Sequence, residues 1–153
     1  MAPTTGMQTN LATFLWFDTN ATAAAKLYCE IFPDAKITQT SQMSTSFEIA
    51  GQRYIAFNGG PHYKLNPAAS LFVTCADQAE VDALWGRFLA AGGVENQCGW
   101  LVDPFGLSWQ IIPRQLHELM SDPDPARSNR VRQAMLKMVK IDVAALQRAH
   151  AGT

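Results

Sequence analysis

Two residues have the chemistry of a nucleophile and a base. Cys98 carries a thiol, and His62 carries an imidazole just after a predicted strand. A thiol becomes a nucleophile only when a neighbouring base or a positive environment deprotonates it. The pair is therefore a candidate for covalent catalysis, although no spacing in the sequence shows that the two side chains meet. Cys29 and Cys75 lie inside apolar runs, and we expect them to be buried as small hydrophobic groups.

A second set of residues could hold a ligand without reacting with it. Strand alternation places Asn58 on one face with Tyr54 and Ala56, and it places Gln110 on one face with Ser108. Apolar pockets with a few polar groups are the usual form of a small-molecule site. The residues that we expect to bind the ligand are Phe14, Trp16, Asn58, Gln97, Trp100, Trp109 and Gln110. The alternative is that the tryptophans are core residues and that backbone groups satisfy the amides.

The elements that must position these residues follow one order twice. In the first half an aromatic strand at 11–17 is followed by a helix from Ala21 to Ile31, which ends before Pro33. An alternating strand from Ala35 and a hairpin of two strands, 45–49 and 53–57, complete this half. This half therefore reads β, α, β, β, β, over residues 11–60.

The second half repeats that order over residues 68–113. A strand at 70–75 precedes a helix that starts at Asp77, where Glu80 forms a capping box. The helix has one apolar stripe and ends at two glycines. Three short strands complete the half, and we expect them at 95–98, 100–102 and 107–112. The repeated order predicts an α+β fold of two βαβββ modules within a single domain, 1–153.

A C-terminal extension of helices, residues 121–151, breaks this symmetry. Asp124 and Pro125 predict the start of one helix, and Asp142 predicts the start of a second. From Ser121 onwards there are six Lys or Arg and three Asp, so the extension has a charge of +3 and the rest of the chain −4. We expect the extension to lie on its own acidic domain or on a partner subunit; the alternative is a membrane surface.

The composition excludes several classes of function. The chain has 153 residues, of which 48% are hydrophobic and only 16% are charged, with 12 Lys and Arg against 13 Asp and Glu. This balance argues against disorder and against a nucleic-acid partner. No apolar stretch is long enough for a membrane span, and no signal peptide begins the sequence, so we expect a cytoplasmic protein. Three cysteines without CxxC spacing indicate neither disulfides nor a zinc site.

Several motifs together resemble a known family. They are the loop Asn58-Gly59-Gly60-Pro61-His62, the run from Gln97 to Pro113 with its Asp103-Pro104-Phe105-Gly106 turn, Ser121 to Pro125, and Lys140-Ile141-Asp142. This pattern, from about Leu11 to Ala149, is similar to the PhnB-like family of the vicinal oxygen chelate superfamily. That superfamily includes glyoxalases, bleomycin-resistance proteins and extradiol dioxygenases. The stretch 41–46 is shorter than the loop that such proteins usually have, so we expect one pocket wall to be more open.

The resemblance implies curved sheets around a cavity, often completed by a second subunit, and in some members a metal. Its ligand positions fall near Thr13, Asn58, Ser70 and Gln110 in this chain. Neutral amides and hydroxyls bind a divalent ion weakly, so we expect no catalytic metal and no cofactor. The three histidines, His62, His117 and His150, also lack ligand spacing.

These expectations lead to a homodimeric protein that binds a small molecule. The alternative is an enzyme that acts on an oxygenated small molecule, with a glyoxalase-type or dioxygenase-type activity. Members of the family are often labelled 3-demethylubiquinone-9 3-methyltransferases. The common methyltransferases that use S-adenosylmethionine have a glycine-rich turn between a strand and a helix, and the sequence contains no GxGxxG motif.

Overall fold

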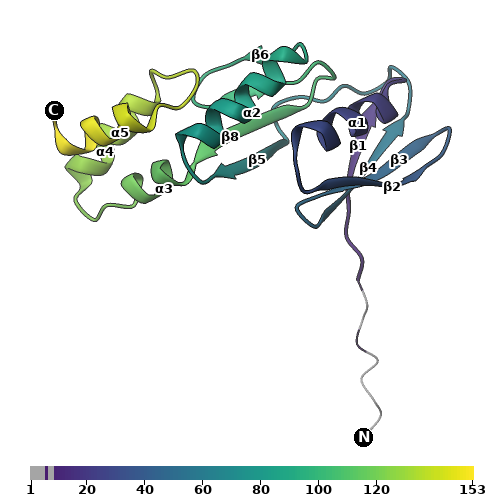
Figure 1. Ribbon diagram of the computed structural model, residues 1–153, viewed down its shortest axis with the longest axis horizontal. Helices are drawn as coiled ribbons and strands as arrows, with labels where there is room; N and C mark the ends of the chain where they lie inside the picture. Colours follow the sequence, from purple (N-terminus) through teal and green to yellow (C-terminus); the bar gives the residue numbers. More distant parts are fainter. Residues whose placement is uncertain (1–5, 7–8) are drawn as a thin grey trace, which may run out of the picture. The chain divides into compact units, whose positions relative to one another are not determined.

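The computed structural model describes residue 6 and residues 9–153, and it divides the chain into two compact units (Figure 1). The boundary lies between Lys64 and Leu65. The first predicted module forms the first unit. The second module and the C-terminal extension together form the second unit.

The first unit is a four-stranded sheet with one helix on one face. Its elements are β1 (Thr13–Phe17), α1 (Ala21–Ile31), β2 (Ala35–Thr40), β3 (Ser44–Ile49) and β4 (Gln52–Asn58). The strand order is β1-β4-β3-β2, with β1 parallel to β4 and the other pairs antiparallel. Tyr28 of α1 packs on Phe47 of β3, which stacks on Tyr54 of β4, and all three rings are buried. Aromatic packing of this kind holds the helix on the sheet.

The second unit repeats this topology. Its elements are β5 (Ser70–Cys75), α2 (Gln78–Ala90), β6 (Val94–Glu95), β7 (Trp100–Val102) and β8 (Ser108–Pro113), in the strand order β5-β8-β7-β6. The predicted capping box is present, because the Glu80 N–H donates to Asp77 and the Ala76 N–H donates to the Glu80 carboxylate. The predicted α+β fold of two βαβββ modules is confirmed.

Two local predictions were wrong. The strand expected at 95–98 is only Val94–Glu95, because Cys98 has a left-handed backbone with φ of +59° and cannot continue an extended strand. The structure also contains a helix that we did not predict, α3 (Arg114–Met120), directly after Pro113. Proline has no N–H to donate, and its extended backbone here lets the helix begin at the next residue.

The C-terminal extension packs on the second unit through an apolar cluster of its own. Two further helices, α4 (Pro125–Met135) and α5 (Val143–Ala151), begin at the predicted aspartate caps. Because α3 packs on both of them, the extension in the structure begins earlier than expected, and from here on it means α3, α4 and α5. The buried members of the cluster are Ile112, Leu116, Val131, Ile141 and Leu146. Ile112 belongs to β8, so the cluster joins the extension to the sheet. The expectation that the extension lies on its own domain is therefore confirmed.

Polar contacts fix the extension at two further places. The turn before β7 donates two backbone hydrogen bonds to it, from Cys98 N to Met138 O and from Gly99 N to Val139 O (2.8 and 2.7 Å). On α2, the Gln78 amide donates to Ile141 O and accepts from Val143 N. These bonds satisfy backbone groups between α4 and α5 that would otherwise lack a partner.

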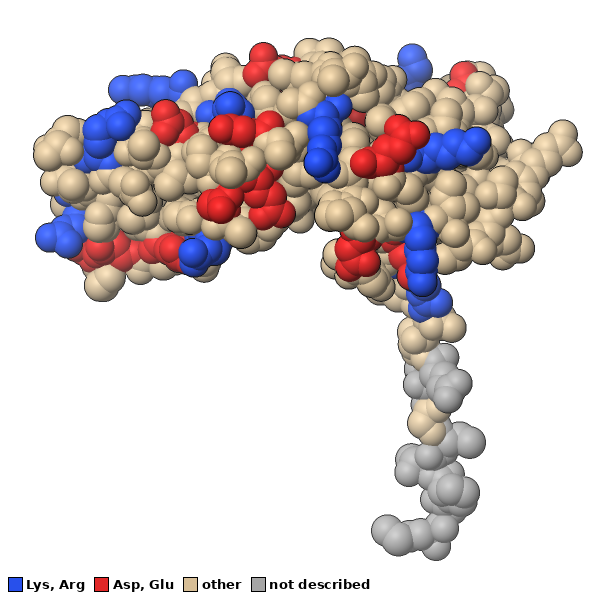
Figure 2. Space-filling model, in the orientation of Figure 1, with Lys and Arg blue, Asp and Glu red and all other residues tan. Residues whose placement is uncertain are grey.

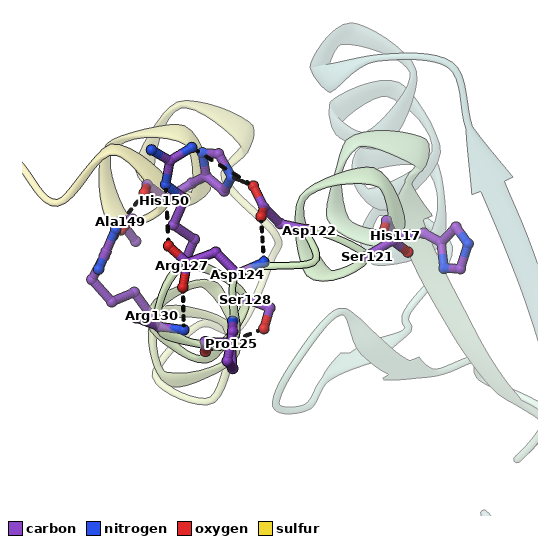
Figure 3. Close-up of polar contacts among 11 residues, drawn as sticks. His117, Ser121, Asp122, Asp124, Pro125, Arg127, Ser128, Arg130, Ala149 and His150 are labelled. Atoms are coloured by element: carbon purple, nitrogen blue, oxygen red, sulfur yellow. Dashed lines mark hydrogen bonds and ion pairs between the residues drawn. The ribbon is translucent and has the colours of Figure 1, made fainter.

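Asp122 joins the helices of the extension to one another (Figure 3). Its carboxylate accepts from Asp124 N at 2.8 Å and contacts the His150 ring at 2.7 Å. The Asp124 N–H is the main cause that lowers the pKa of Asp122 from its ordinary value, and the bond to His150 adds to it. Arg130 donates to the carbonyls of Ala149 and His150, the last turn of α5.

Charged residues of both signs lie over the second unit on the face drawn in Figure 2. One ion pair of this unit joins Lys140, before α5, to Asp82 of α2 at 2.8 Å. Within the described residues, no helix has the length and apolarity needed to cross a membrane.

Candidate ligand-binding site

Each sheet of the two units has one face covered by a helix and one open face. In the second unit Leu101, Trp109 and Ile111 point to the covered face and are buried. Trp109 packs on Phe88 of α2, with 4.9 Å between ring centroids. The alternate residues of the same strands, together with those of β5, therefore face the open side. They include Ser70, Phe72, Trp100 and Gln110.

The open face of the second sheet carries a pocket of about 290 Å³. Its walls are Phe72, Cys98, Trp100, Gln110, Ile112, Leu116, His117, Met120 and Met135. A second hollow of about 240 Å³ shares three of these residues, Phe72, Ile112 and His117, so the two adjoin. The volume of the first is close to the lower end of the range for ligand pockets, about 300 to 1,000 Å³.

The pocket has few polar groups, and no Lys, Arg, Asp or Glu lines it. Gln110 donates from its amide nitrogen to Ser70 Oγ at 3.0 Å. Among the described residues, neither the amide oxygen of Gln110 nor the ring of His117 has a hydrogen-bond partner. Next to Gln110 on the same face, the buried hydroxyl of Ser108 is also unpartnered. The pocket therefore offers hydrogen bonds to a ligand, and its walls are otherwise apolar.

Cys98 lines the pocket together with a histidine that we had not paired with it. His62 lies in the first unit, exposed in the loop after β4. The histidine that shares the pocket with Cys98 is His117 of α3. By contrast, burial raises the pKa of Cys29 and raises that of Cys75 to about 12. Cys75 is buried, as we expected, whereas Cys29 is only half-buried.

The open face of the first unit is aromatic. Phe14 is 54% exposed and packs on Phe57. Trp16 meets Phe57 and Tyr63 edge to face, and its indole N–H donates to Gly60 O at 2.9 Å. A Cβ at Gly59 would collide with the Trp16 ring, so this position has to be glycine for the ring to lie there. Phe14 and Trp16 thus lie on the open face of the first sheet, opposite the face of Asn58.

Asn58 and Trp109 are on the wrong faces for the cage that we expected. Asn58 shares its face with Tyr54 and Ala56, as predicted, but that is the face under α1. Its side-chain oxygen accepts from Ala21 N at 2.9 Å, and its amide donates to Gln42 O. Asn58 therefore caps the start of α1, which has free N–H groups. Trp109 is only 1% exposed and is a core residue.

Gln97 is also not part of the pocket wall. It is exposed in the turn before β7, where its carbonyl accepts from Trp100 N. Of the residues that we expected to bind a ligand, the pocket thus brings together Trp100 and Gln110, and it adds Cys98.

The residues at the metal-ligand positions of the superfamily do not fit a metal. Ser70 and Gln110 do meet on the open face of the second sheet, but both are neutral. Thr13 and Asn58 belong to the covered face of the first sheet, where Thr13 pairs with Tyr54 and Asn58 pairs with Phe17. Among the described residues there is no group of three or more His, Cys, Asp and Glu that could hold a metal ion.

Sequence reasoning missed the wall that the extension contributes. Leu116, His117 and Met120 come from α3, and Met135 comes from α4. A signal was present, because Leu116 and Met120 are spaced by four residues, as on one side of a helix. The segment is short, because α3 has only 7 residues.

Two βαβββ units of this topology define the fold of the vicinal oxygen chelate superfamily. Residues 9–112 match the family described as 3-demethylubiquinone-9 3-methyltransferase, and the chain belongs to this PhnB-like family. The match ends at β8, so the C-terminal residues that we took as part of the resemblance lie beyond it. The comparison with curated proteins gave no match.

Solved structures share the fold. The chain is 25% identical to a putative 3-demethylubiquinone-9 3-methyltransferase, PhnB protein, from Bacillus cereus, with a TM-score of 0.63 over 69% of this chain and 99% of that one. Protein PA1353 from Pseudomonas aeruginosa has 15% identity and a TM-score of 0.56, over 69% and 98% of the two chains. The fosfomycin resistance protein FosX from Listeria monocytogenes, complexed with Mn(II) and sulfate, has 17% identity and a TM-score of 0.50, over 67% and 88%.

Proposed function

We propose that the second unit binds a small organic molecule in the pocket on its open face, and that it does so without a catalytic metal. The observation that carries this proposal is the pocket itself. Two aromatic side chains, Phe72 and Trp100, and several aliphatic ones surround the single amide of Gln110. Phe72 is 59% exposed, so a ligand that covers it would remove a large apolar area from water.

The donor set supports the metal-free part of the proposal. Hard divalent cations are held by carboxylates and carbonyl oxygens, and softer ones by several imidazoles or thiolates. The pocket has one thiol, Cys98, and one imidazole, His117, and no carboxylate. In the adjoining hollow, the carboxylate of Glu118 is already paired with Arg114 at 2.8 Å.

The activity in the name of the family is not the activity that we propose. The common methyltransferases bind their cofactor at a glycine-rich turn that leads into a helix. In this chain Gly59-Gly60 leads to Pro61, and β5 is joined to α2 by a segment without glycine. The pocket that we propose lies on the open face of the second sheet instead.

Ligand binding by site variants tests the proposal. Small aromatic molecules are titrated into the purified full chain, and binding is followed by tryptophan fluorescence and by the melting temperature. We expect Trp100→Leu to weaken binding by about tenfold or more, since it removes an aromatic wall. Leu136→Ala is the control, because Leu136 is half exposed outside the pocket wall. Equal affinity of Trp100→Leu and the wild-type protein would refute the site.

Metal content tests the second half of the proposal. We expect purified protein to contain less than a stoichiometric amount of any divalent metal, and EDTA to leave its melting temperature unchanged. Elemental analysis and a thermal melt measure these quantities. A tightly bound stoichiometric ion whose removal lowers the melting temperature would contradict the metal-free site and favour the enzymatic alternative.

A further inference from the structure

The pocket is built from two parts of the chain, one that matches the family and one that lies beyond the match. Five of its residues, including Trp100 and Gln110, lie within residues 9–112, which match the family. The other four are Leu116, His117, Met120 and Met135, which lie in the C-terminal extension beyond the match. This wall therefore lies beyond the residues that match the family.

The added wall is chemically distinct from the sheet wall. Met120 and Met135 are unbranched thioethers, which adapt their shape to a ligand and contact aromatic rings favourably. His117 supplies the only imidazole, and its ring points away from the contacts around Asp122 (Figure 3). Its ring has no hydrogen-bond partner among the described residues. His117 is thus available to a ligand and is not needed to hold the helices together.

The charges around the pocket limit what it can hold. None of its nine wall residues is Lys, Arg, Asp or Glu. The charged residues that line the adjoining hollow, Arg114 and Glu118, form an ion pair with each other. A carboxylate or phosphate would lose its hydration here without gaining a counterion, which is costly. The pocket therefore suits an uncharged molecule.

Resting on the proposed function, we infer that the C-terminal extension is the specificity-determining wall of the pocket, and that its ligand is an uncharged aromatic molecule with a hydroxyl-type polar group. The aromatic part lies against Phe72 and Trp100 and is covered by the two methionines. The hydroxyl donates to the free amide oxygen of Gln110 and accepts from the ring N–H of His117. This arrangement uses both unpartnered polar groups of the pocket.

Three probes of one size test the chemistry of the ligand. They are 1-naphthol, 1-methylnaphthalene and 1-naphthoate, titrated into the full chain. We expect 1-naphthol to bind about tenfold more tightly than either of the others, since it alone is uncharged and has a hydroxyl. Tighter binding of the anionic 1-naphthoate would overturn the ligand class. Absence of binding by all three up to millimolar concentration would overturn both the ligand class and the proposed function.

Variants in the extension test its role. His117→Ala should weaken 1-naphthol about fivefold to tenfold and leave 1-methylnaphthalene unchanged, and His117→Gln should restore part of the loss. Met135→Ala should weaken both uncharged probes, whereas the neighbouring Leu136→Ala should weaken neither. Melting temperatures of all variants separate lost binding from lost folding.

Trp100→Leu separates a failure of the proposed site from a failure of the inference about the extension. If Trp100→Leu abolishes binding while His117→Ala and Met135→Ala bind every probe as the wild-type protein does, the proposed site holds and the inference about the extension is wrong. If Trp100→Leu is also without effect, the proposed function itself is wrong.

Discussion

Cys75 and Cys98 are residues of the same unit in opposite environments. Cys75 is fully buried at the end of β5, and burial, with the nearby carboxylates of Glu80 and Asp77, raises its pKa to about 12. Cys98 lies partly exposed in the pocket wall. Because the thiolate is the reactive form, the two thiols should differ in their rates of modification.

We therefore predict selective labelling of Cys98. At pH 8 only about one Cys75 in ten thousand would be a thiolate in the native protein. Iodoacetamide with peptide mass mapping should modify Cys98 well before Cys75, and Cys98→Ser should remove that early adduct. A bound aromatic ligand should slow the labelling of Cys98. Equal labelling of the two cysteines in the folded protein would contradict the burial that we describe.

Gly99 decides, at the scale of elements, how the turn before β7 meets the extension. Its backbone has a φ of +82°, and a Cβ there would come within 3.1 Å of Ile111 O as well as the side chains of Ile112 and Ile141. Ile111 O belongs to the backbone of β8, which cannot move freely. The turn also donates to Val139 O from this residue. Gly99 is therefore where β8, the turn and the extension pack most closely.

Gly99→Ala should destabilise the protein by about 2 to 4 kcal/mol, through overpacking together with the left-handed backbone. Gly106→Ala is the matched control, because Gly106 has a φ of +93° but open space around its Cβ position. That variant should cost only about 1 kcal/mol. Urea unfolding measures both. Equal losses would show that the backbone angle alone matters and that the close packing at Gly99 does not.

Elements with strong local signals could be predicted, and the site could be predicted only in part. The caps at Asp77, Asp124 and Asp142 and the apolar stripe of α2 depend on neighbours in sequence, and they are where we expected them. Asn58 was misplaced because alternation tells which residues share a face but not which face a helix will cover. Trp109 was misplaced because the expected cage took residues from both faces of β8, although alternation puts Trp109 opposite Gln110.

The position of the pocket wall that the extension contributes could not be predicted from the sequence. Its position depends on the packing of Val131, Ile141 and Leu146 against Ile112. Those contacts join residues far apart in the sequence, and periodicity along one element carries no information about them. The role of His117 therefore became visible only with the fold.

Asp122 should make the docking of the extension sensitive to acid. Its folded pKa is lowered, chiefly by the Asp124 N–H and then by His150. A lowered pKa stabilises the fold fully above the ordinary value of 3.8 and ceases to do so as the pH falls through the folded value. We expect Asp122→Asn to lower the melting temperature at neutral pH, and the difference from the wild-type protein to shrink as the pH falls from about 5 to about 2.

Thermal melts across this pH range check the prediction. Asp18→Asn is the control, because Asp18 is an exposed aspartate of the first unit whose side chain takes no part in the contacts of the extension. It should follow the wild-type curve. A constant difference between Asp122→Asn and the wild-type protein from pH 7 down to pH 2 would show that the ionised carboxylate does not provide the stability.

The low content of charged residues is a property of the whole molecule. Only 16% of residues are charged, against about 25% in an average soluble domain. Part of this difference is explained by the second unit, which covers an apolar sheet face with its own helices. In the described part of the first unit, α1 is the one helix, and Phe14, Met43 and Tyr63 remain more than half exposed. Exposed apolar groups of this size favour contact with another surface.

We therefore expect a homodimer in solution. Light scattering coupled to gel filtration should give about twice the chain mass of 16.8 kDa at micromolar concentration. Phe14→Asp should shift the protein towards the monomer, because it puts a charge on the open face of the first unit, where a stable interface would bury about 800 Å² per subunit. Ala23→Asp, at an exposed position of α1, should not. A wild-type monomer at that concentration would mean that the apolar face is covered by something other than a second copy, and the shortage of charge would then need a different partner to explain it.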